Sequence, residues 1–327
     1  SIPAVYLLAR RLCSSKKTAL LSSVFAAFTV SFIQSAHFGI TENLLVFLVI
    51  LLCYFSTKFA ERPRILVSGA IGILFGIAVA TKTSALSFFL MPLVAYLLAC
   101  VRRPNKQQFV FTSLLFVDLL LISILVFVIF SPYTLFSFGK FVESMRYEYG
   151  VATGKFSVPY TLQFVNTPAY IYQLKNLFWQ MGPLVLFSLP GFFLLALQSL
   201  RKRHTAFLVF FLFPIFYFAY VGSWHTKFIR FMFPLLPFLT IAAANFFIFL
   251  SSRWKTAGKI LLLSVSILTL AWALAFFGIY TREQTRIVAS EWMYTHIPFG
   301  STIFREHWDD GLPVPIALDS STTHGYI

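Results

Sequence analysis

The stretch Gln34-Ser35-Ala36-His37-Phe38-Gly39-Ile40-Thr41-Glu42-Asn43 separates two long apolar runs, residues 19–36 and 44–59. Each run is about as long as a helix that crosses a bilayer, which needs roughly 20 mostly apolar residues. A carboxylate at the edge of such a segment is costly unless it has a partner or a function. Glu42 is therefore the first candidate site residue.

The composition extends this interpretation to the whole chain. Of the 327 residues, 58% are hydrophobic and only 11% are charged, and the mean hydropathy is +0.80. The apolar runs are continuous rather than alternating, which indicates helices, and lipid permits only helices or closed barrels. We expect an all-α polytopic membrane protein with about nine spanning helices, preceded by a truncated one that ends near residue 9. The nine segments are residues 18–36, 41–59, 65–81, 84–101, 109–130, 177–200, 206–222, 229–250 and 259–280.

The distribution of charge predicts the topology. The net charge is +15, but the basic residues form no stripe on a polar domain, which argues against nucleic acid as a partner. Sixteen of the 26 basic residues fall in five short loops, which the positive-inside rule places in the cytoplasm. They are Arg10, Arg11, Lys16, Lys17, Lys58, Arg62, Arg64, Arg102, Arg103, Lys106, Arg201, Lys202, Arg203, Arg253, Lys255 and Lys259.

The alternate loops then lie outside. They contain residues 37–43, the turn at Lys82, residues 131–176, residues 223–230 and the C-terminal tail. Within residues 131–176 the side chains of Phe138, Phe141, Met145 and Tyr149 recur at helical spacing, which predicts an amphipathic helix lying in the membrane interface.

The two ends of the chain predict its domain organisation. The first residues are typical of a span cut in half, and the last residues end abruptly. We therefore expect a fragment, with a membrane module over residues 1–280 and the beginning of an external soluble domain over residues 281–327. The latter is expected to contain a polar helix at 282–296 and a short strand at 301–304. Three cysteines, Cys13, Cys53 and Cys100, indicate no disulfide framework.

Four motifs together resemble a known family. They are His37 to Asn43, the glycine-containing run from Gly72 to Lys82, the run from Lys227 to Pro237, and Ile297 to Ser301. Their order, sidedness and spacing resemble the polytopic GT-C glycosyltransferases, in particular relatives of dolichyl-phosphate-mannose protein mannosyltransferase and of the lipid A aminoarabinose transferase. The resemblance implies inverting transfer of a sugar from a polyprenyl-phosphate donor to a protein, glycolipid or polysaccharide acceptor. It also implies a multi-pass protein of a prokaryotic plasma membrane whose site faces outward.

In the family that the sequence resembles, the main catalytic carboxylate lies in a loop that would precede residue 1. Within this chain, Glu42 and His37 are the catalytic candidates. Lys82, Lys227, Arg230 and His225 are candidates for binding the donor phosphate, because leaving-group charge must be met by cations. Arg146 and Glu148 are candidates for the acceptor or for the cavity lining.

Each candidate has a simpler interpretation that stays open. Glu42 complements the dipole of the helix that it begins, and Lys82 can extend to the membrane surface as many such lysines do. No metal site is assigned, although a divalent metal ion is left open because Glu306, His307, Asp309 and Asp310 form a cluster of suitable composition. Asp118 lies within a predicted span without a basic neighbour.

Two other classes of function remain open. A transporter or lipid flippase would use charges and broken helices within the membrane. A non-catalytic membrane assembly subunit would need neither. A carboxylate in the loop upstream of residue 1 would favour the enzyme.

Overall fold

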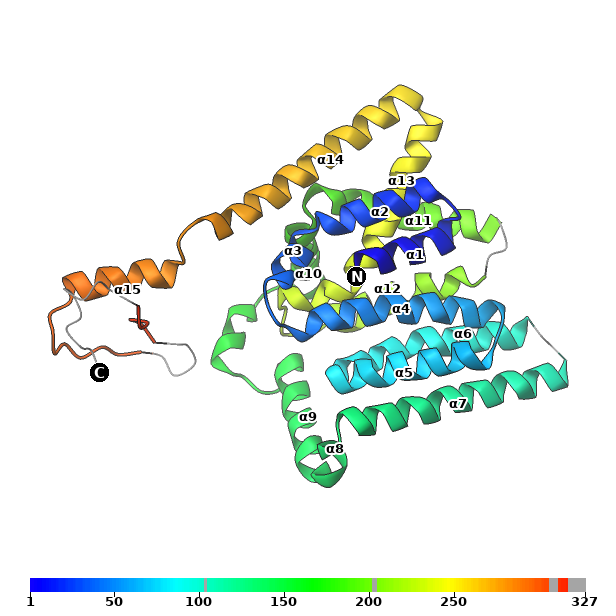
Figure 1. Cartoon of the computed structure of the whole chain (residues 1–327), viewed down its shortest axis with the longest axis horizontal. Helices are drawn as coiled ribbons and strands as arrows, with labels where there is room; N and C mark the ends of the chain where they lie inside the picture. The colour runs from blue at the N-terminus through cyan, green and yellow to red at the C-terminus, as the bar shows by residue number, and fades with distance from the viewer. Residues whose placement is uncertain (103–104, 202–204, 306–310, 317–327) are drawn as a thin grey trace. The chain divides into compact units, whose positions relative to one another are not determined.

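The computed structural model describes residues 1–102, 105–201, 205–305 and 311–316, and these residues form helices without any strand. The chain divides into two units, Ser1–Ala273 and Leu274–Ile327. The first unit is a bundle of apolar helices, in which α4 to α7 lie side by side and α9 stands across their ends (Figure 1). The predicted helical membrane fold is confirmed at this level.

The apolar helices correspond to the predicted segments, but the count of nine is not confirmed. Six helical stretches are long and apolar enough to cross a membrane, or seven if a bent pair counts as one span. Two further apolar helices, α5 (Ile65–Thr81) and α12 (Phe207–Gly222), are shorter, with 17 and 16 residues. The other members of the bundle are α1 (Ile2–Cys13), α2 (Lys16–Ala27), α3 (Val30–Ala36), α4 (Thr41–Glu61), η1 (Thr83–Phe89), α6 (Leu90–Val101), α7 (Lys106–Phe130), α10 (Ala169–Met181), η3 (Gly182–Leu184), α11 (Val185–Arg201), η4 (Ile229–Leu235), α13 (Leu236–Arg253) and α14 (Lys255–Phe277).

Two predicted spans are broken in the structure. The segment predicted as residues 18–36 bends by 58° between α2 and α3. At this break the hydroxyl of Thr29 donates to the carbonyl of Phe25 at 2.8 Å. The segment predicted as residues 177–200 begins earlier and breaks at Gly182, whose φ of 60° favours glycine. The sequence pattern reports hydropathy and so does not detect either break.

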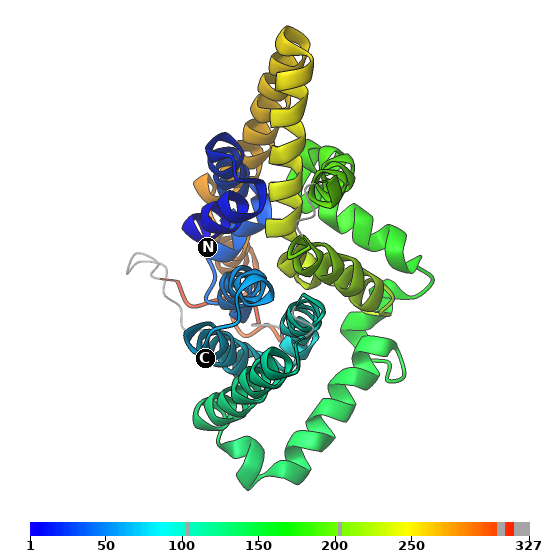
Figure 2. The same ribbon diagram turned by 90° about the vertical axis from the view of Figure 1, so that its right-hand side faces the viewer.

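Burial separates the centre of the bundle from its lipid-facing helices. In the most apolar window of the Ile229–Arg253 stretch 83% of residues are buried, and 61% in that of α4. In α7 the value is only 17%, although its mean hydropathy is higher. A helix that is apolar on every side yet exposed is expected to face lipid. Figure 2 shows α7 at the edge of the bundle.

Glycines set a close helix contact between α5 and α7. A Cβ at Gly72 would lie 2.8 Å from the Cβ of Ile122, and one at Gly76 would lie 2.6 Å from the carbonyl oxygen of Ser123. Small residues four apart let membrane helices approach closely. Asp118 also lies at this contact, where its Oδ2 is 2.9 Å from the hydroxyl of Ser68. Its partner is thus a hydroxyl on the neighbouring helix.

The loop predicted to contain an amphipathic helix forms α8 (Tyr133–Phe136), α9 (Phe138–Thr153) and η2 (Pro159–Phe164). The predicted helix is confirmed as α9, which ends at Gly154 with a φ of 80°. A Cβ there would lie 2.8 Å from the ring of His225, so glycine meets both a backbone and a packing requirement.

The second unit is described by itself. It contains η5 (Gly278–Thr281) and α15 (Thr285–His296), so the polar helix predicted at 282–296 is present. The hydroxyl of Ser290 accepts a hydrogen bond from the Val314 amide at 2.9 Å. The strand predicted at 301–304 is wrong, because these residues have no strand partner in the described part of the chain. The acidic cluster from Glu306 to Asp310 lies outside the described residues.

Candidate functional site

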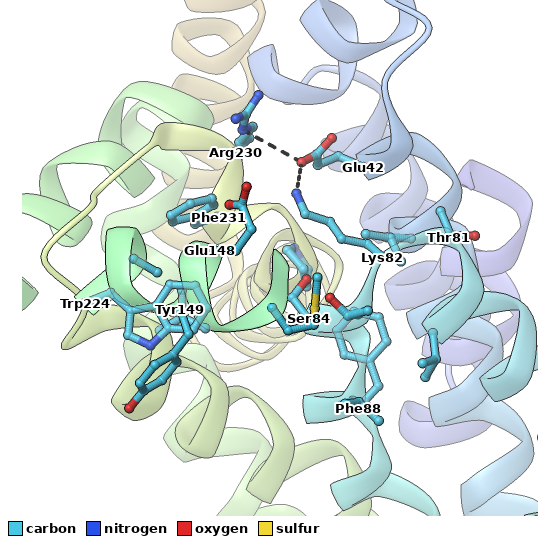
Figure 3. A pocket seen from close by; sticks show the side chains of 18 of the residues that line it. Glu42, Thr81, Lys82, Ser84, Phe88, Glu148, Tyr149, Trp224, Arg230 and Phe231 are labelled. Carbon is cyan, nitrogen blue, oxygen red and sulfur yellow. Dashed lines mark hydrogen bonds and ion pairs between the residues drawn. The ribbon is translucent and has the colours of Figure 1, made fainter. Parts of the chain in front are cut away.

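A cavity of about 780 Å³ lies within the first unit, where several helices end. Its wall is formed by the ends of α4, α5, α7 and α12, by η1 and η4, and by one side of α9. Figure 3 shows Glu42, Lys82 and Arg230 on one side of this cavity, and Tyr149 and Trp224 on another. The loops that the charge pattern assigned to one side of the membrane therefore meet here.

Glu42 lies in the first turn of α4, where a carboxylate is favoured by the helix dipole. Its Oε1 is 2.7 Å from the Nζ of Lys82 and 3.9 Å from the Nε of Arg230, as the dashed lines in Figure 3 mark. Its Oε2 accepts a hydrogen bond from the hydroxyl of Thr41 at 3.2 Å. Glu42 therefore joins two cations that come from distant parts of the chain.

The cations are more exposed than the acid that joins them. The side chain of Lys82 is 35% exposed and that of Arg230 is 51% exposed, against 8% for Glu42. Lys82 ends α5 in extended conformation, with a φ of −159°. The three formal charges sum to one positive charge, which is presented to the cavity by the two cations.

Aromatic rings fix the loop that contains Arg230. Its guanidinium lies 5.3 Å from the ring centre of Phe228, a cation–π distance. The ring of Phe228 packs in turn against those of Phe164 and Phe231, at 5.1 and 5.5 Å between centres. Trp224 packs against Phe231 at 5.7 Å. The loop is thus irregular in backbone but held by packing.

Helix α9 supplies the facing wall. Phe141, Met145, Glu148 and Tyr149 of this helix line the cavity. Glu148 is exposed. Its negative charge acts on Tyr160 of η2, which also lines the cavity. The pKa of Tyr160 is raised by burial first and then by Tyr147 and Glu148, whereas Arg230 acts to lower it. Tyr160 therefore remains a neutral hydroxyl between groups of opposite charge.

Away from the charges the lining is apolar. Leu45, Val79, Phe88, Phe127 and Phe233 contribute to it. Phe88 lies at the bundle side, 5.6 Å from the ring centre of the buried Phe213. The cavity thus combines a cationic, partly hydrated region with an apolar one, an arrangement that suits a ligand with an anionic head and an apolar tail.

Lys227 and His225 do not line the cavity, although the sequence suggested both as phosphate ligands. Lys227 is only 3% exposed, its Nζ donates to the carbonyl of His225 at 2.7 Å, and burial lowers its pKa. In a regular helix, the spacing of three residues would place Lys227 and Arg230 on one face. Phe228 has an extended ψ of 137° between them, so the side chains diverge.

His37 and Arg146 also lie outside the lining. His37 ends α3, and its Nδ1 is 2.7 Å from the carbonyl oxygen of Ile33. Arg146 is exposed on a different face of α9 from Glu148. Glu42, Lys82, Arg230 and Glu148 are thus the predicted residues that the structure brings to one cavity.

Sequence reasoning missed several lining residues. Trp224, Phe228 and Phe231 follow each other closely in a predicted external loop, which was the signal available. Asn43 has a structural role that the motif concealed, because its Nδ2 donates to the carbonyls of Ser35 and Phe38 at 2.6 and 3.0 Å. These bonds fix the turn that leads into Glu42.

No group of three or more His, Cys, Asp or Glu side chains suited to a metal ion occurs in the described ranges. The cationic side chains Lys82 and Arg230 are the positive groups at the cavity.

Comparison with known proteins supports the resemblance drawn from the motifs. Residues 1–152 match the family described as dolichyl-phosphate-mannose-protein mannosyltransferase. No curated protein matches the chain significantly.

Two solved structures have a similar fold, and both are of the Archaeoglobus fulgidus oligosaccharyltransferase. The apo form is 14% identical with a TM-score of 0.51, and the matched region covers 91% of this chain and 46% of the oligosaccharyltransferase chain. The complex with Zn and sulfate is 15% identical with a TM-score of 0.50, and the matched region covers 91% of this chain and 42% of the oligosaccharyltransferase chain. The chain therefore spans less than half the length of these relatives and shares their GT-C-like fold.

Proposed function

We propose that this chain forms the membrane module of a glycosyltransferase. The enzyme moves a sugar from a polyprenyl-phosphate donor to an acceptor at the external face of a plasma membrane. The match to the mannosyltransferase family over residues 1–152 and the fold shared with an oligosaccharyltransferase support this class of reaction. Fold alone does not fix function, so the proposal depends on the cavity.

One observation carries the proposal: Lys82 and Arg230 converge on Glu42 and remain exposed to a cavity whose lining is largely apolar. A polyprenyl-phosphate sugar has one negative charge at its phosphodiester and a long apolar chain. The single net positive charge of the cluster matches that head, and the apolar wall matches the chain. Glu42 then orients the two cations and prevents their mutual repulsion from spreading them.

The chemistry follows from these positions. The acceptor oxygen bonds to the anomeric carbon as the bond from that carbon to the phosphate oxygen breaks. The phosphate leaves with an additional negative charge, which Lys82 and Arg230 stabilise. The acceptor proton passes to a carboxylate held within hydrogen-bond reach.

Glu148 is the carboxylate that we assign to the acceptor side. Within the described lining there are two carboxylates, and Glu42 is covered and engaged by cations whereas Glu148 is exposed. Tyr149 and Trp224 lie beside it in the lining, where flat aromatic faces can pack against a sugar ring. We propose that His225 and Lys227 support the loop. We propose no contact between the donor and either His37 or Arg146.

The test is a transfer assay with the full-length protein in nanodiscs and a panel of polyprenyl-phosphate sugars. Lys82→Met should lower kcat/KM by about 100-fold, as loss of one preorganised charge-stabilising donor does. Lys58→Met is the matched control, because Lys58 lies at the other end of the bundle against the ring of Tyr54. Absence of transfer with every donor, or equal loss in both variants, would overturn the proposal. Right-side-out and inverted vesicles test its sidedness.

A further inference from the structure

Helix α10 has three buried amide side chains on one face, Gln173, Asn176 and Gln180. Their spacing of three and four residues places them on a single helical face. Gln173 and Gln180 are fully buried and Asn176 is 8% exposed. Burying amides in an apolar helix is unfavourable unless they form hydrogen bonds, so their partners indicate why they are there.

Two of these amides hold the backbone of the loop that leads to Arg230. The Nδ2 of Asn176 donates to the carbonyl of Lys227 at 2.8 Å, and the Nε2 of Gln180 donates to the carbonyl of Ile229 at 3.0 Å. The Oε1 of Gln173 accepts a hydrogen bond from the same Asn176 Nδ2 at 2.9 Å, and this bond fixes the orientation of the Asn176 amide. The two bonded carbonyls lie on either side of Phe228.

The loop needs these donors because its backbone is irregular. Phe228 is extended, so the carbonyl of Lys227 is not part of a regular helix, and buried backbone outside a helix needs hydrogen-bond partners from elsewhere in the protein. On its other side the amide of Thr226 donates to the carbonyl of Ala152 in α9 at 3.2 Å. The loop is therefore fixed between α9 and α10.

The position of Arg230 depends on this attachment. Its guanidinium lies against the ring of Phe228, the residue between the two held carbonyls, and its Nε is 3.9 Å from Glu42. The side chain of Arg230 itself is 51% exposed.

We propose that Asn176 and Gln180 are positioning residues that place Arg230 in the cationic region of the cavity, acting through the carbonyls of Lys227 and Ile229. The proposal rests on the proposed function in one respect, namely that Arg230 meets the donor phosphate. Neither amide touches the donor.

The first measurement is steady-state transfer by the full-length protein in nanodiscs. Gln180→Met keeps the length of the side chain and removes the donor. It should raise the donor KM about tenfold, as expected when a charged hydrogen bond to the phosphate is misplaced, with a smaller change in kcat. The matched control is Gln198→Met, which removes an amide contact between α11 and α13, where Asn245 Nδ2 lies 3.1 Å from Gln198 Oε1. Equal KM values in wild type and Gln180→Met would overturn the proposal.

A double-mutant cycle separates positioning from general stability. In an Arg230→Gln background the Gln180→Met change should have little further effect on KM, because the group it positions is gone. A purely structural role predicts the same fold-change in both backgrounds, and that additivity would contradict the proposal.

Hydrogen–deuterium exchange tests the positioning without any reaction. Amide exchange in residues 225–230 should accelerate in Gln180→Met and remain as in wild type in Gln198→Met. If amide exchange in residues 225–230 is unchanged in Gln180→Met, Gln180 does not hold the loop to α10, whether or not the enzyme is active. Faster exchange in a protein that transfers no sugar would instead refute the proposed function and leave the attachment standing.

Discussion

The two ends of α4 each contain a glutamate paired with a cation from another helix, and the pairs are built differently. At the last turn Glu61 pairs with Arg11 at 2.6 Å, and the Nε of Arg11 also donates to Thr57 at 2.7 Å. There the cation is the more buried partner, 19% exposed against 31%. At the first turn Glu42 is the buried partner and its two cations are exposed.

The helix dipole explains part of this difference. A carboxylate in the first turn of a helix is favoured, whereas one in the last turn is disfavoured and needs compensation. Arg11 supplies that compensation for Glu61 and its hydrogen bonds are directed inward. Glu42 needs less, and its two partners retain donors that point to the cavity. A pair whose cations are exposed can bind an anion, and a pair whose cation is buried mainly holds helices together.

The largest expected effect comes from removing both cavity cations. Lys82→Met combined with Arg230→Gln should lower transfer by about 1,000-fold or more, because both groups meet the charge that develops on the leaving phosphate. The assay is single-turnover transfer by the full-length protein. If the rate of transfer falls by less than about tenfold, the pair at Glu42 is not an anion-binding site, and it does not differ in function from the pair at Glu61.

The next effect compares the two acids. Glu42→Gln should reduce transfer about 10- to 100-fold with the fold retained, since it releases the cations from their common anchor. Glu61→Gln should leave transfer per folded molecule close to that of wild type. Size-exclusion profiles serve as the control for folding, and equal activity loss in the two variants would contradict the comparison.

A smaller effect is expected on stability at the Arg11 end. Arg11→Gln removes charge-assisted hydrogen bonds to Glu61 and Thr57 and should lower the free energy of unfolding by about 1–3 kcal/mol. Thermal unfolding in nanodiscs measures it. Lys82→Gln removes the more exposed cation and leaves Arg230 beside Glu42, so it should change stability less. The reverse order would show that the pair at Glu42 is the structural one.

The smallest effect concerns pH and contrasts the buried Lys227 with the exposed Lys140. Burial lowers the pKa of Lys227 from its ordinary 10.5, so the folded chain releases this proton at a lower pH than the unfolded chain. Between the two pKa values the unfolded chain binds more protons, and stability therefore rises with pH there. Lys227→Met should flatten the rise in thermal stability as the pH increases toward 10.5. Lys140→Met changes an exposed position of α9 and is the control. It should leave the rise in thermal stability with pH as in wild type.

Much of the bundle could be predicted from the sequence, because hydropathy over 20 residues reports burial or lipid contact directly. The breaks at Thr29 and Gly182 could not, since they depend on a side-chain bond and on one backbone angle. Charge bias grouped Glu42, Lys82 and Arg230 on one side, and the structure brings these three together.

Side-chain direction was the part that the sequence could not supply. Pairing Lys227 with Arg230 assumed helical backbone, but one extended residue between them turns Lys227 inward. Likewise His37 and Glu42 are close in sequence, yet His37 lies against the carbonyl of Ile33 and does not line the cavity that Glu42 lines. Proximity along the chain gave candidates, and backbone conformation decided among them.

The shortness of α5 and α12 has a consequence for the bilayer itself. With 17 and 16 residues at about 1.5 Å each they are about 26 and 24 Å long, against a hydrocarbon core of about 30 Å. Both helices end at the cavity, α5 at Thr81 and α12 at Gly222. A membrane meets short helices by thinning around them. We therefore expect the bilayer to be thinner beside this cavity, which would shorten the path of a lipid-linked sugar under the proposed function.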